Sequence, residues 1–150
     1  MESNTPNSPT PVEAKKSPAR YAFAVARVLM GLGFCVFGLN GFFHFIPEPK
    51  TPMSAGAADF AGALFKTGYM FHLISGTQLL SGILLLLNRF VPLALILLMP
   101  VLVNIIAFHI FLQPAGFAPG AILTALELFL AWGYRAAYCP ILTPRTTPTT

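Results

Sequence analysis

The stretch that decides the fold is GYMFHLISGTQLLSGILLLLNRFVPLALILLMPVLVNIIAFHIFL, residues 68–112. It contains two apolar runs, Gly68–Leu87 and Val91–Leu112, which only the short turn Asn88–Phe90 separates. Each run has about the 20 residues that an α-helix needs to cross ~30 Å of hydrocarbon. So short a turn sends the second helix back along the first. The stretch therefore predicts an antiparallel pair of membrane-spanning helices.

Charged residues are scarce along the whole chain. Of its 150 residues, 55% are hydrophobic and 9% are charged, and the mean hydropathy is +0.71. A soluble domain carries about 25% charged residues because water must solvate its surface, so a soluble globular protein is excluded. The net charge of +4 comes from scattered Lys and Arg, and no nucleic-acid partner is expected. The two cysteines, Cys35 and Cys139, have neither metal-binding nor redox spacing.

Two further apolar runs complete the fold class. Tyr21–Phe45 and Ala118–Tyr138 are also long enough to span a bilayer, and a short turn joins the latter to the preceding run. The sequence therefore predicts an all-α membrane protein, a four-transmembrane-helix antiparallel bundle. Its membrane domain is expected at residues 20–140, between disordered tails rich in Pro, Ser and Thr at 1–19 and 141–150.

The long connection Ile46–Thr67 contains a short helix of its own. Ser54 can cap this helix, and apolar residues then recur at helical spacing, namely Ala57, Phe60, Ala61, Leu64 and Phe65. We expect it to lie in the interface over the outer mouth of the bundle, either as an anchor for the loop or as a lid.

The distribution of basic residues predicts the orientation in the membrane. With the N-terminus inside, only Lys50 and Lys66 lie on the outer side. The other basic residues lie inside or toward that leaflet, which is the positive-inside bias of a protein with both termini in the cytoplasm. They are Lys15, Lys16, Arg20, Arg27, Arg89, Arg135 and Arg145.

Seven polar side chains lie within or at the ends of the predicted spans, where each is expensive unless it finds a partner. The three histidines fall at one depth near the outer leaflet, and three amides and one acid form a second tier closer to the midplane. Together they predict a polar funnel, open to the outer side, that binds a cofactor. Its residues are Asn40, His44, His72, Gln78, Asn104, His109 and Glu127.

Other interpretations of these side chains remain open. Asn104 and His109 point about 140° apart on an ideal helix, although Pro100 is expected to kink this one. The amides can be hydrogen-bonding glue between helices, and Arg27 can reach Glu127 to form a structural buried pair. Aromatic residues near the end of the last span are typical of an interfacial belt, namely Trp132, Tyr134 and Tyr138.

The histidines and the carboxylate can serve two kinds of cofactor. They can hydrogen-bond the carbonyls of a quinone and relay its protons. With weaker support, because the histidines lack metal-ligand spacing, they can hold Zn, Cu or Fe. The sequence has no nucleophile arrangement, phosphate-binding loop or haem attachment motif. No catalytic residue and no metal ligand is therefore assigned.

Four motifs follow one another along the chain: GLNGFFHFIPEP (38–49), TGYMFHLISGTQLLSGILLLLNRFVPLAL (67–95), PVLVNIIAFHIFL (100–112) and LELFLAWGYR (126–135). In this order they resemble the DoxX family of four-helix bacterial membrane proteins, over about residues 20–140. The resemblance implies an inner-membrane protein with a quinone-linked redox role, since relatives include the DoxD-like subunit of a thiosulfate:quinone oxidoreductase. These 150 residues include no paired cysteines and no soluble redox domain, so that role requires another subunit.

These observations predict a membrane subunit or accessory factor of a quinone-linked redox system, which is not catalytic alone. The alternative is a non-enzymatic structural or assembly subunit of a larger membrane complex, in which the polar residues are packing glue. The expected partners are the lipid bilayer and either another redox subunit or further copies of the same chain.

Overall fold

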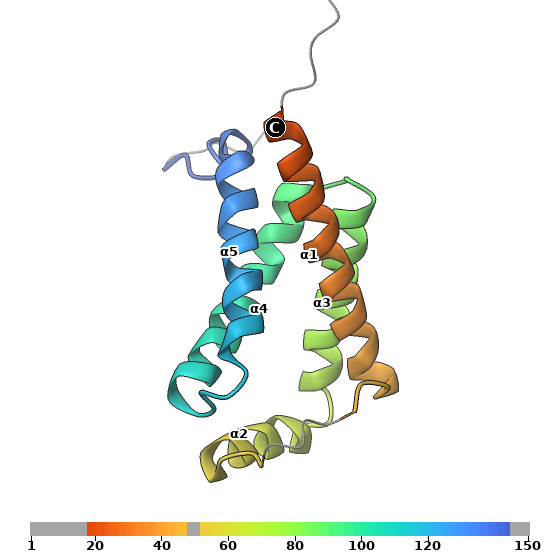
Figure 1. Ribbon diagram of the computed structural model, residues 1–150, viewed down its shortest axis with the longest axis vertical. Coiled ribbons are helices and arrows are strands. Elements are labelled where there is room, and N and C mark those ends of the chain that lie inside the picture. Colours follow the sequence, from red (N-terminus) through yellow and green to blue (C-terminus); the bar gives the residue numbers. More distant parts are fainter. Residues whose placement is uncertain (1–17, 48–51, 145–150) are drawn as a thin grey trace, which may run out of the picture.

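A computed structural model describes residues 18–47 and 52–144, and every regular element in these ranges is helical. Four of the helices run alternately down and up beside one another, while α2 lies across one end of the bundle (Figure 1). The predicted all-α class is confirmed. The elements are α1 (Pro18–Phe43), α2 (Ala55–Lys66), α3 (Met70–Leu86), α4 (Val91–Phe111), α5 (Phe117–Gly133) and a short 3-10 helix, η1 (Arg135–Ala137).

Two of the helices are long and apolar enough to cross a membrane by themselves. α1 has 26 residues and α4 has 21, which at 1.5 Å per residue gives ~39 Å and ~32 Å against ~30 Å of hydrocarbon. α3 and α5 have 17 residues each, and α3 passes the same test only together with α2, from which it is bent by 89°. The described residues thus contain two candidate spans, or three with the bent pair, and one shorter apolar helix.

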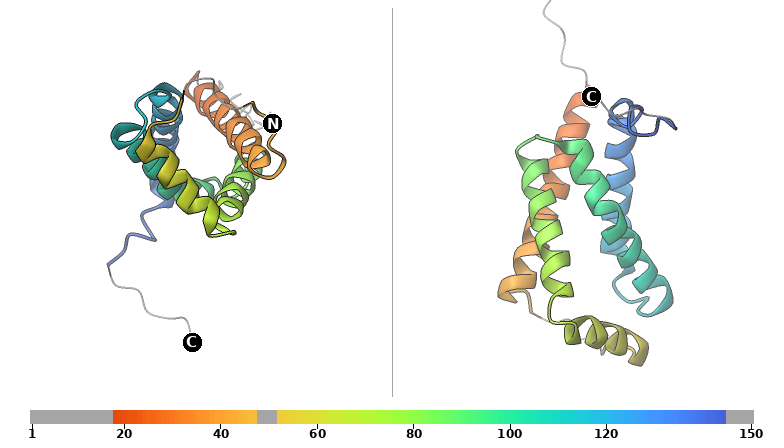
Figure 2. Two further views of the ribbon diagram at one scale, coloured as in Figure 1. Left: turned by 90° about the horizontal axis from the view of Figure 1, so that it is seen from below. Right: turned by 180° about the vertical axis from the view of Figure 1, so that it is seen from behind.

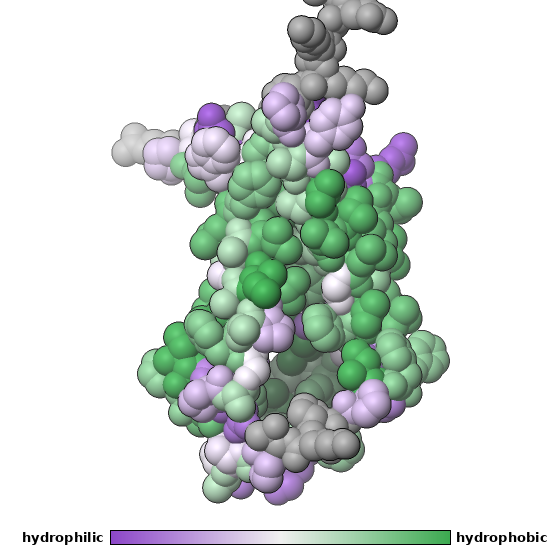
Figure 3. All heavy atoms as spheres, in the orientation of Figure 1, coloured by the Kyte–Doolittle hydropathy of each residue, from purple (hydrophilic) through white to green (hydrophobic). Residues whose placement is uncertain are grey.

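The surface of the bundle has the polarity of a membrane protein. Figure 3 shows, on the face in view, an apolar band across the middle and hydrophilic residues toward both ends. The two shorter helices contribute to this band, since Leu73 on α3 and Ile122 on α5 are 58% and 62% exposed. Soluble monomers rarely expose apolar surface on this scale. The helices therefore indicate a multi-pass membrane protein.

The predicted domain limits fall close to the edge of the described residues. α1 begins at Pro18, so the last two residues of the predicted N-terminal tail are helical. Proline suits a first helical turn because the amide it lacks would have no intrahelical partner there. Residues 1–17 and 145–150 lie outside the described ranges, and the tail prediction for them stays a prediction.

The four long helices form two pairs that separate toward α2, α1 with α3 and α4 with α5; α1 and α3 pack most closely, and α4 packs against α3 about as extensively as against α5. The pairs converge at the end where α1 begins and diverge toward α2 (Figures 1 and 2). Small residues bring α1 and α3 together: a methyl group on Gly38 would lie 2.7 Å from the Leu79 backbone nitrogen, and one on Gly82 would lie 2.8 Å from that of Cys35. Such close backbone approach is typical of helix packing in membranes.

The turn between α3 and α4 confirms the predicted hairpin. Asn88 takes the left-handed conformation, with φ of 53°, and asparagine tolerates this conformation at helix C-termini. The Arg89 amide donates to the Leu84 carbonyl at 3.0 Å, and the Asn88 amide donates to the Leu85 carbonyl at 3.1 Å. These two bonds satisfy carbonyls at the end of α3 and reverse the chain into α4.

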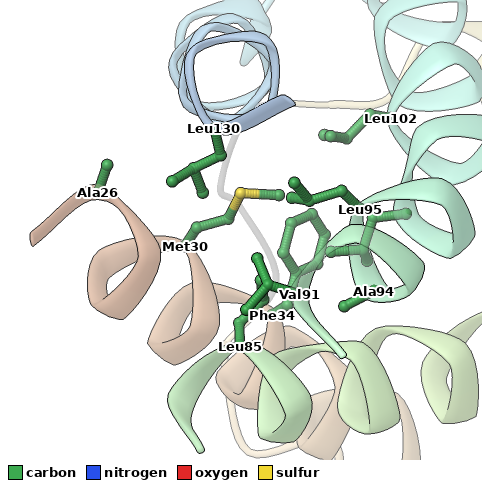
Figure 4. Packing of buried hydrophobic residues seen from close by; sticks show 10 residues of the cluster. Ala26, Met30, Phe34, Leu85, Val91, Ala94, Leu95, Leu102 and Leu130 are labelled. Atoms are coloured by element: carbon green, nitrogen blue, oxygen red, sulfur yellow. The ribbon is translucent and has the colours of Figure 1, made fainter. Parts of the chain in front are cut away.

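The hydrophobic core lies where the two pairs converge. Met30 and Phe34 from α1 project toward Leu85 from α3, Leu95 from α4 and Leu130 from α5, and all five side chains are at most 1% exposed. Figure 4 shows the side chains of the four helices meeting in this cluster. Burying a side chain of this size contributes about 1.5–3 kcal/mol in water. In a bilayer, tight packing supplies most of the stabilisation instead.

α2 bridges the open ends of the two pairs. The predicted cap is present, because the Ser54 hydroxyl accepts a hydrogen bond from the Ala57 amide at 3.2 Å. The Ser54 backbone amide donates to the Gln113 side chain at 2.9 Å, and the Phe60 ring lies 5.8 Å from the Phe108 ring. α2 therefore begins beside the α4–α5 turn and leads into α3, crossing the bundle end as Figure 2 shows.

Candidate functional site

A groove of about 650 Å³ lies between α4 and α5. Its volume lies within the ~300–1,000 Å³ of typical small-molecule sites. We call it the α4–α5 groove. Its lining is almost wholly apolar, with Asn104 and Glu127 as the polar exceptions and the Tyr138 ring at one end. The lining residues are Leu95, Ile96, Met99, Pro100, Val103, Asn104, Ala107, Glu127, Ala131 and Tyr138.

Helix periodicity explains this lining. Ile96, Pro100, Val103 and Ala107 follow each other at three- and four-residue spacing, which places them along one face of α4. Pro100 has no amide hydrogen, so the Ile96 carbonyl one turn earlier receives no backbone hydrogen bond from it. This face is exposed at Ile96 and Val103. The groove thus opens sideways on the apolar flank of the bundle.

Glu127 is the unusual residue of the groove. Its exposed fraction is 0%, and neither carboxyl oxygen has a hydrogen-bond partner within the described residues. A buried polar group without a partner costs about 1–3 kcal/mol, and more if it is charged. Native proteins retain few such groups, and each one requires an explanation. A ligand that enters the groove with a hydrogen-bonding head would supply the missing partner.

The predicted pair between Arg27 and Glu127 is wrong. The Arg27 guanidinium donates through Nη1 to the backbone carbonyls of Leu85 and Leu86, the latter at 3.4 Å. The last carbonyls of a helix lack intrahelical donors and attract positive charge. Arg27 therefore caps the C-terminus of α3, and within residues 18–47 and 52–144 Glu127 has no basic partner.

The predicted polar residues at the outer ends of α1 and α3 each have different surroundings. The Asn40 side-chain oxygen accepts a hydrogen bond from the Ile46 amide at 2.7 Å and thereby fastens the chain after α1. His44 follows α1 in a left-handed conformation and is exposed. His72 is also exposed, with its ring 5.7 Å from that of Phe42.

The remaining predicted residues divide between the core, the groove and a turn. Gln78 is buried in α3 at 8% exposure. Asn104 lines the α4–α5 groove together with Glu127. His109 Nδ1 lies 2.8 Å from the Gln113 carbonyl at the end of α4, so its ring faces the α4–α5 turn. Of the seven predicted residues, the groove brings together Asn104 and Glu127.

The predicted histidines do not assemble into a metal centre. Within residues 18–47 and 52–144, no three His, Cys, Asp or Glu side chains lie close enough together to hold a metal ion. The sequence predicts a site at the outer mouth and an aromatic belt that includes Tyr138, whereas Tyr138 is among the residues that line the groove. Two features of the sequence pointed to the groove: the apolar face of α4, and an acid, Glu127, inside the next predicted span.

Comparison of the chain with protein-family models, with curated proteins and with solved structures found no match in any of the three.

Proposed function

We propose that this chain is a four-span inner-membrane protein that binds a quinone in the α4–α5 groove, as the membrane subunit or accessory factor of a quinone-linked redox system. One observation carries the proposal: Glu127, whose carboxyl has no hydrogen-bond partner among the described residues, lines an almost wholly apolar cavity on the apolar flank of the bundle. A quinone needs this combination, because its ring and tail are apolar and its carbonyls accept hydrogen bonds.

Each part of the groove has a role in this proposal. Glu127 and Asn104 bind the quinone head, the carboxyl as a donor when protonated and the amide through its NH₂ group. The exposed side chains of Ile96 and Val103 contact the ring and tail. Reduction of a quinone to a quinol consumes two electrons and two protons. Glu127 is placed to pass protons, and a partner redox subunit supplies the electrons.

The proposal includes all four long helices as spans. α3 and α5 fall short of 20 residues, but they stand beside α1 and α4 and carry exposed apolar side chains along the same band. A thinner bilayer locally, or the residues flanking each helix, can make up a difference of this size. The basic residues place both termini in the cytoplasm, so α2 lies at the outer surface. The resemblance to the DoxX family is consistent with this topology.

A specific observation favours a second candidate, a structural or assembly subunit. Three of the polar side chains inside or near the spans bond to nearby backbone: Asn40, His109 and Arg27. Polar residues used in this way stabilise a bundle and require no ligand. The two candidates differ at Glu127, which has no such partner.

Native mass spectrometry of the gently solubilised full chain with added ubiquinone or menaquinone tests the proposal. Glu127→Gln keeps the size of the side chain, removes its exchangeable acid proton and is expected to weaken quinone retention about ten-fold. Asp59→Asn is the matched control, because Asp59 is an exposed acid on α2 outside the groove. Equal retention in both variants, or none in the wild type, would reject the quinone site and favour the structural role.

A further inference from the structure

A second cavity, of about 300 Å³, lies at the opposite end of the bundle from α2. We call it the basic pocket. Arg20 and Arg27 come from α1, Asn88 comes from the α3–α4 turn and Tyr134 follows α5, while the Phe23 ring contributes apolar wall. Three separate segments of the chain thus converge on it. It shares no lining residue with the α4–α5 groove, and the inference does not depend on the quinone proposal.

The charge of the basic pocket is unbalanced. Arg20 and Arg27 are seven residues apart and therefore lie on the same face of α1. Among the described residues, no acidic side chain lines the pocket. The bonds from Arg27 Nη1 to the α3 carbonyls fix its guanidinium in place, and a guanidinium has five N–H donors, so others remain available. The pocket therefore presents two cations, one of them preorganised.

The floor of the basic pocket is closed. Met30, three residues after Arg27, and Leu130, four residues before Tyr134, are fully buried about one turn deeper, and Val91 is 3% exposed. The Phe23 ring stacks on that of Phe129 with centroids 4.5 Å apart, which closes the wall between α1 and α5. An apolar tail cannot pass into the bundle interior from here. The pocket can therefore receive a polar head group at the end of the bundle, but not a longer molecule that extends along the bundle axis.

We propose that the basic pocket binds a phosphate group. Arginine is the side chain best suited to phosphate, because its planar fork donates two parallel hydrogen bonds to two oxygens. The volume equals that of about ten water molecules at ~30 Å³ each, which holds a phosphate with bound water or a small phosphodiester head group. The Asn88 amide can donate to a third oxygen. The phosphate can belong to an anionic phospholipid, whose head groups bind basic pockets between membrane helices, or to a soluble molecule.

Native mass spectrometry of the full chain in mild detergent tests this with three probes. They are phosphatidylglycerol, a diacylglycerol with the same acyl chains but no phosphate, and inorganic phosphate. Arg20→Gln is the test variant, because Arg20 is exposed at the start of α1 and its loss leaves the core intact. Arg89→Gln is the control, because Arg89 is an exposed arginine of the neighbouring turn that does not line the pocket.

We expect the wild type and Arg89→Gln to retain phosphatidylglycerol, and Arg20→Gln to bind it about ten-fold more weakly. If inorganic phosphate displaces the lipid from the wild type but not from Arg20→Gln, the ligand is a soluble phosphate compound. Resistance to displacement would identify the lipid head group. Equal weakening in both arginine variants, equal retention of diacylglycerol, or no binding of either phosphate-bearing probe would overturn the proposal.

Discussion

Replacing Glu127 by leucine is expected to make the protein more stable in detergent. The glutamate side chain is fully buried, and neither carboxyl oxygen has a partner among the described residues. Leucine is similar in volume and has no polar atom to leave unsatisfied. Leu130, one turn further along α5, is fully buried, so the interior face of this helix accepts leucine.

The expected gain in the free energy of unfolding is about 1–3 kcal/mol, the usual cost of one unsatisfied buried polar group. The groove beside Glu127 places the gain toward the lower end of this range, because a leucine at its edge has packing partners on fewer sides. Glu127→Gln keeps a polar head in the same place. We therefore expect it to change the stability by less than about 0.5 kcal/mol.

Equilibrium unfolding of the three proteins in mixed micelles with increasing dodecyl sulfate, followed by circular dichroism, measures the difference. The comparison is made without added quinone, because a bound ligand would stabilise the wild type by mass action. A leucine variant less stable than the wild type by more than about 1 kcal/mol would refute the reasoning, since it would show that the carboxyl forms stabilising bonds. Higher stability together with lost quinone retention would separate the binding role of Glu127 from any structural one.

Three further substitutions test the packing that positions the groove. Gly38→Ala is expected to destabilise the protein by about 1–3 kcal/mol relative to Gly76→Ala, because the new methyl group meets the Leu79 backbone in the first case and open space in the second; equal unfolding midpoints would contradict this. Arg27→Ala removes the side-chain donor to the Leu85 and Leu86 carbonyls, of which Leu85 keeps the Asn88 amide, and we expect a loss of about 1 kcal/mol with faster hydrogen exchange in the α3–α4 turn. Ser54→Ala removes the cap of α2 and is expected to destabilise this helix locally by about 1 kcal/mol. We expect faster hydrogen exchange in the first turn of α2 and no change in α3. Unchanged exchange in α2 would show that its tertiary contacts hold it without the cap.

Much of the fold was predictable because it depends on local patterns. The short turn Asn88–Phe90 between two apolar runs required a hairpin, and Ser54 followed by apolar residues at helical spacing located α2. The lengths of α3 and α5 were less predictable. Hydropathy marks an apolar run, but the helix stops where the backbone turns, and the 89° bend between α2 and α3 follows from Gly68 in the left-handed region.

The site was predictable only in part, because a polar residue in a span has two ways to be satisfied. Near a helix end, free backbone groups compete for it, and Asn40 and His109 bond to such groups. In the middle of a helix the backbone offers no free partner, so Glu127 had to find a side chain, a ligand or nothing. The sequence shows the depth of each residue but not which helix faces meet. Depth alone therefore left open a pair between Arg27 and Glu127, whereas Arg27 bonds to the open end of α3.

The two helix pairs differ in a way that accounts for the position of the groove. α1 and α3 meet through Gly38 and Gly82, so their backbones touch and leave no space between them. α4 has no glycine, and α5 approaches it closely at Gly120, where a methyl group would lie 3.1 Å from Ile105. Glu127 lies two turns further along α5, ~10 Å away. There α4 presents branched and long side chains around Pro100, and the two helices cannot close.

This asymmetry favours a binding role for the α4–α5 pair over a purely structural one. Selection for packing alone would favour an apolar residue at position 127, since removing an unsatisfied acid from the interior is stabilising. The chain instead keeps the acid where the helices separate, while it uses glycines and a sealed core to hold the neighbouring pair rigid. A rigid α1–α3 pair stands beside an open apolar groove that Glu127 helps to line. Binding a lipid-soluble molecule requires such an arrangement.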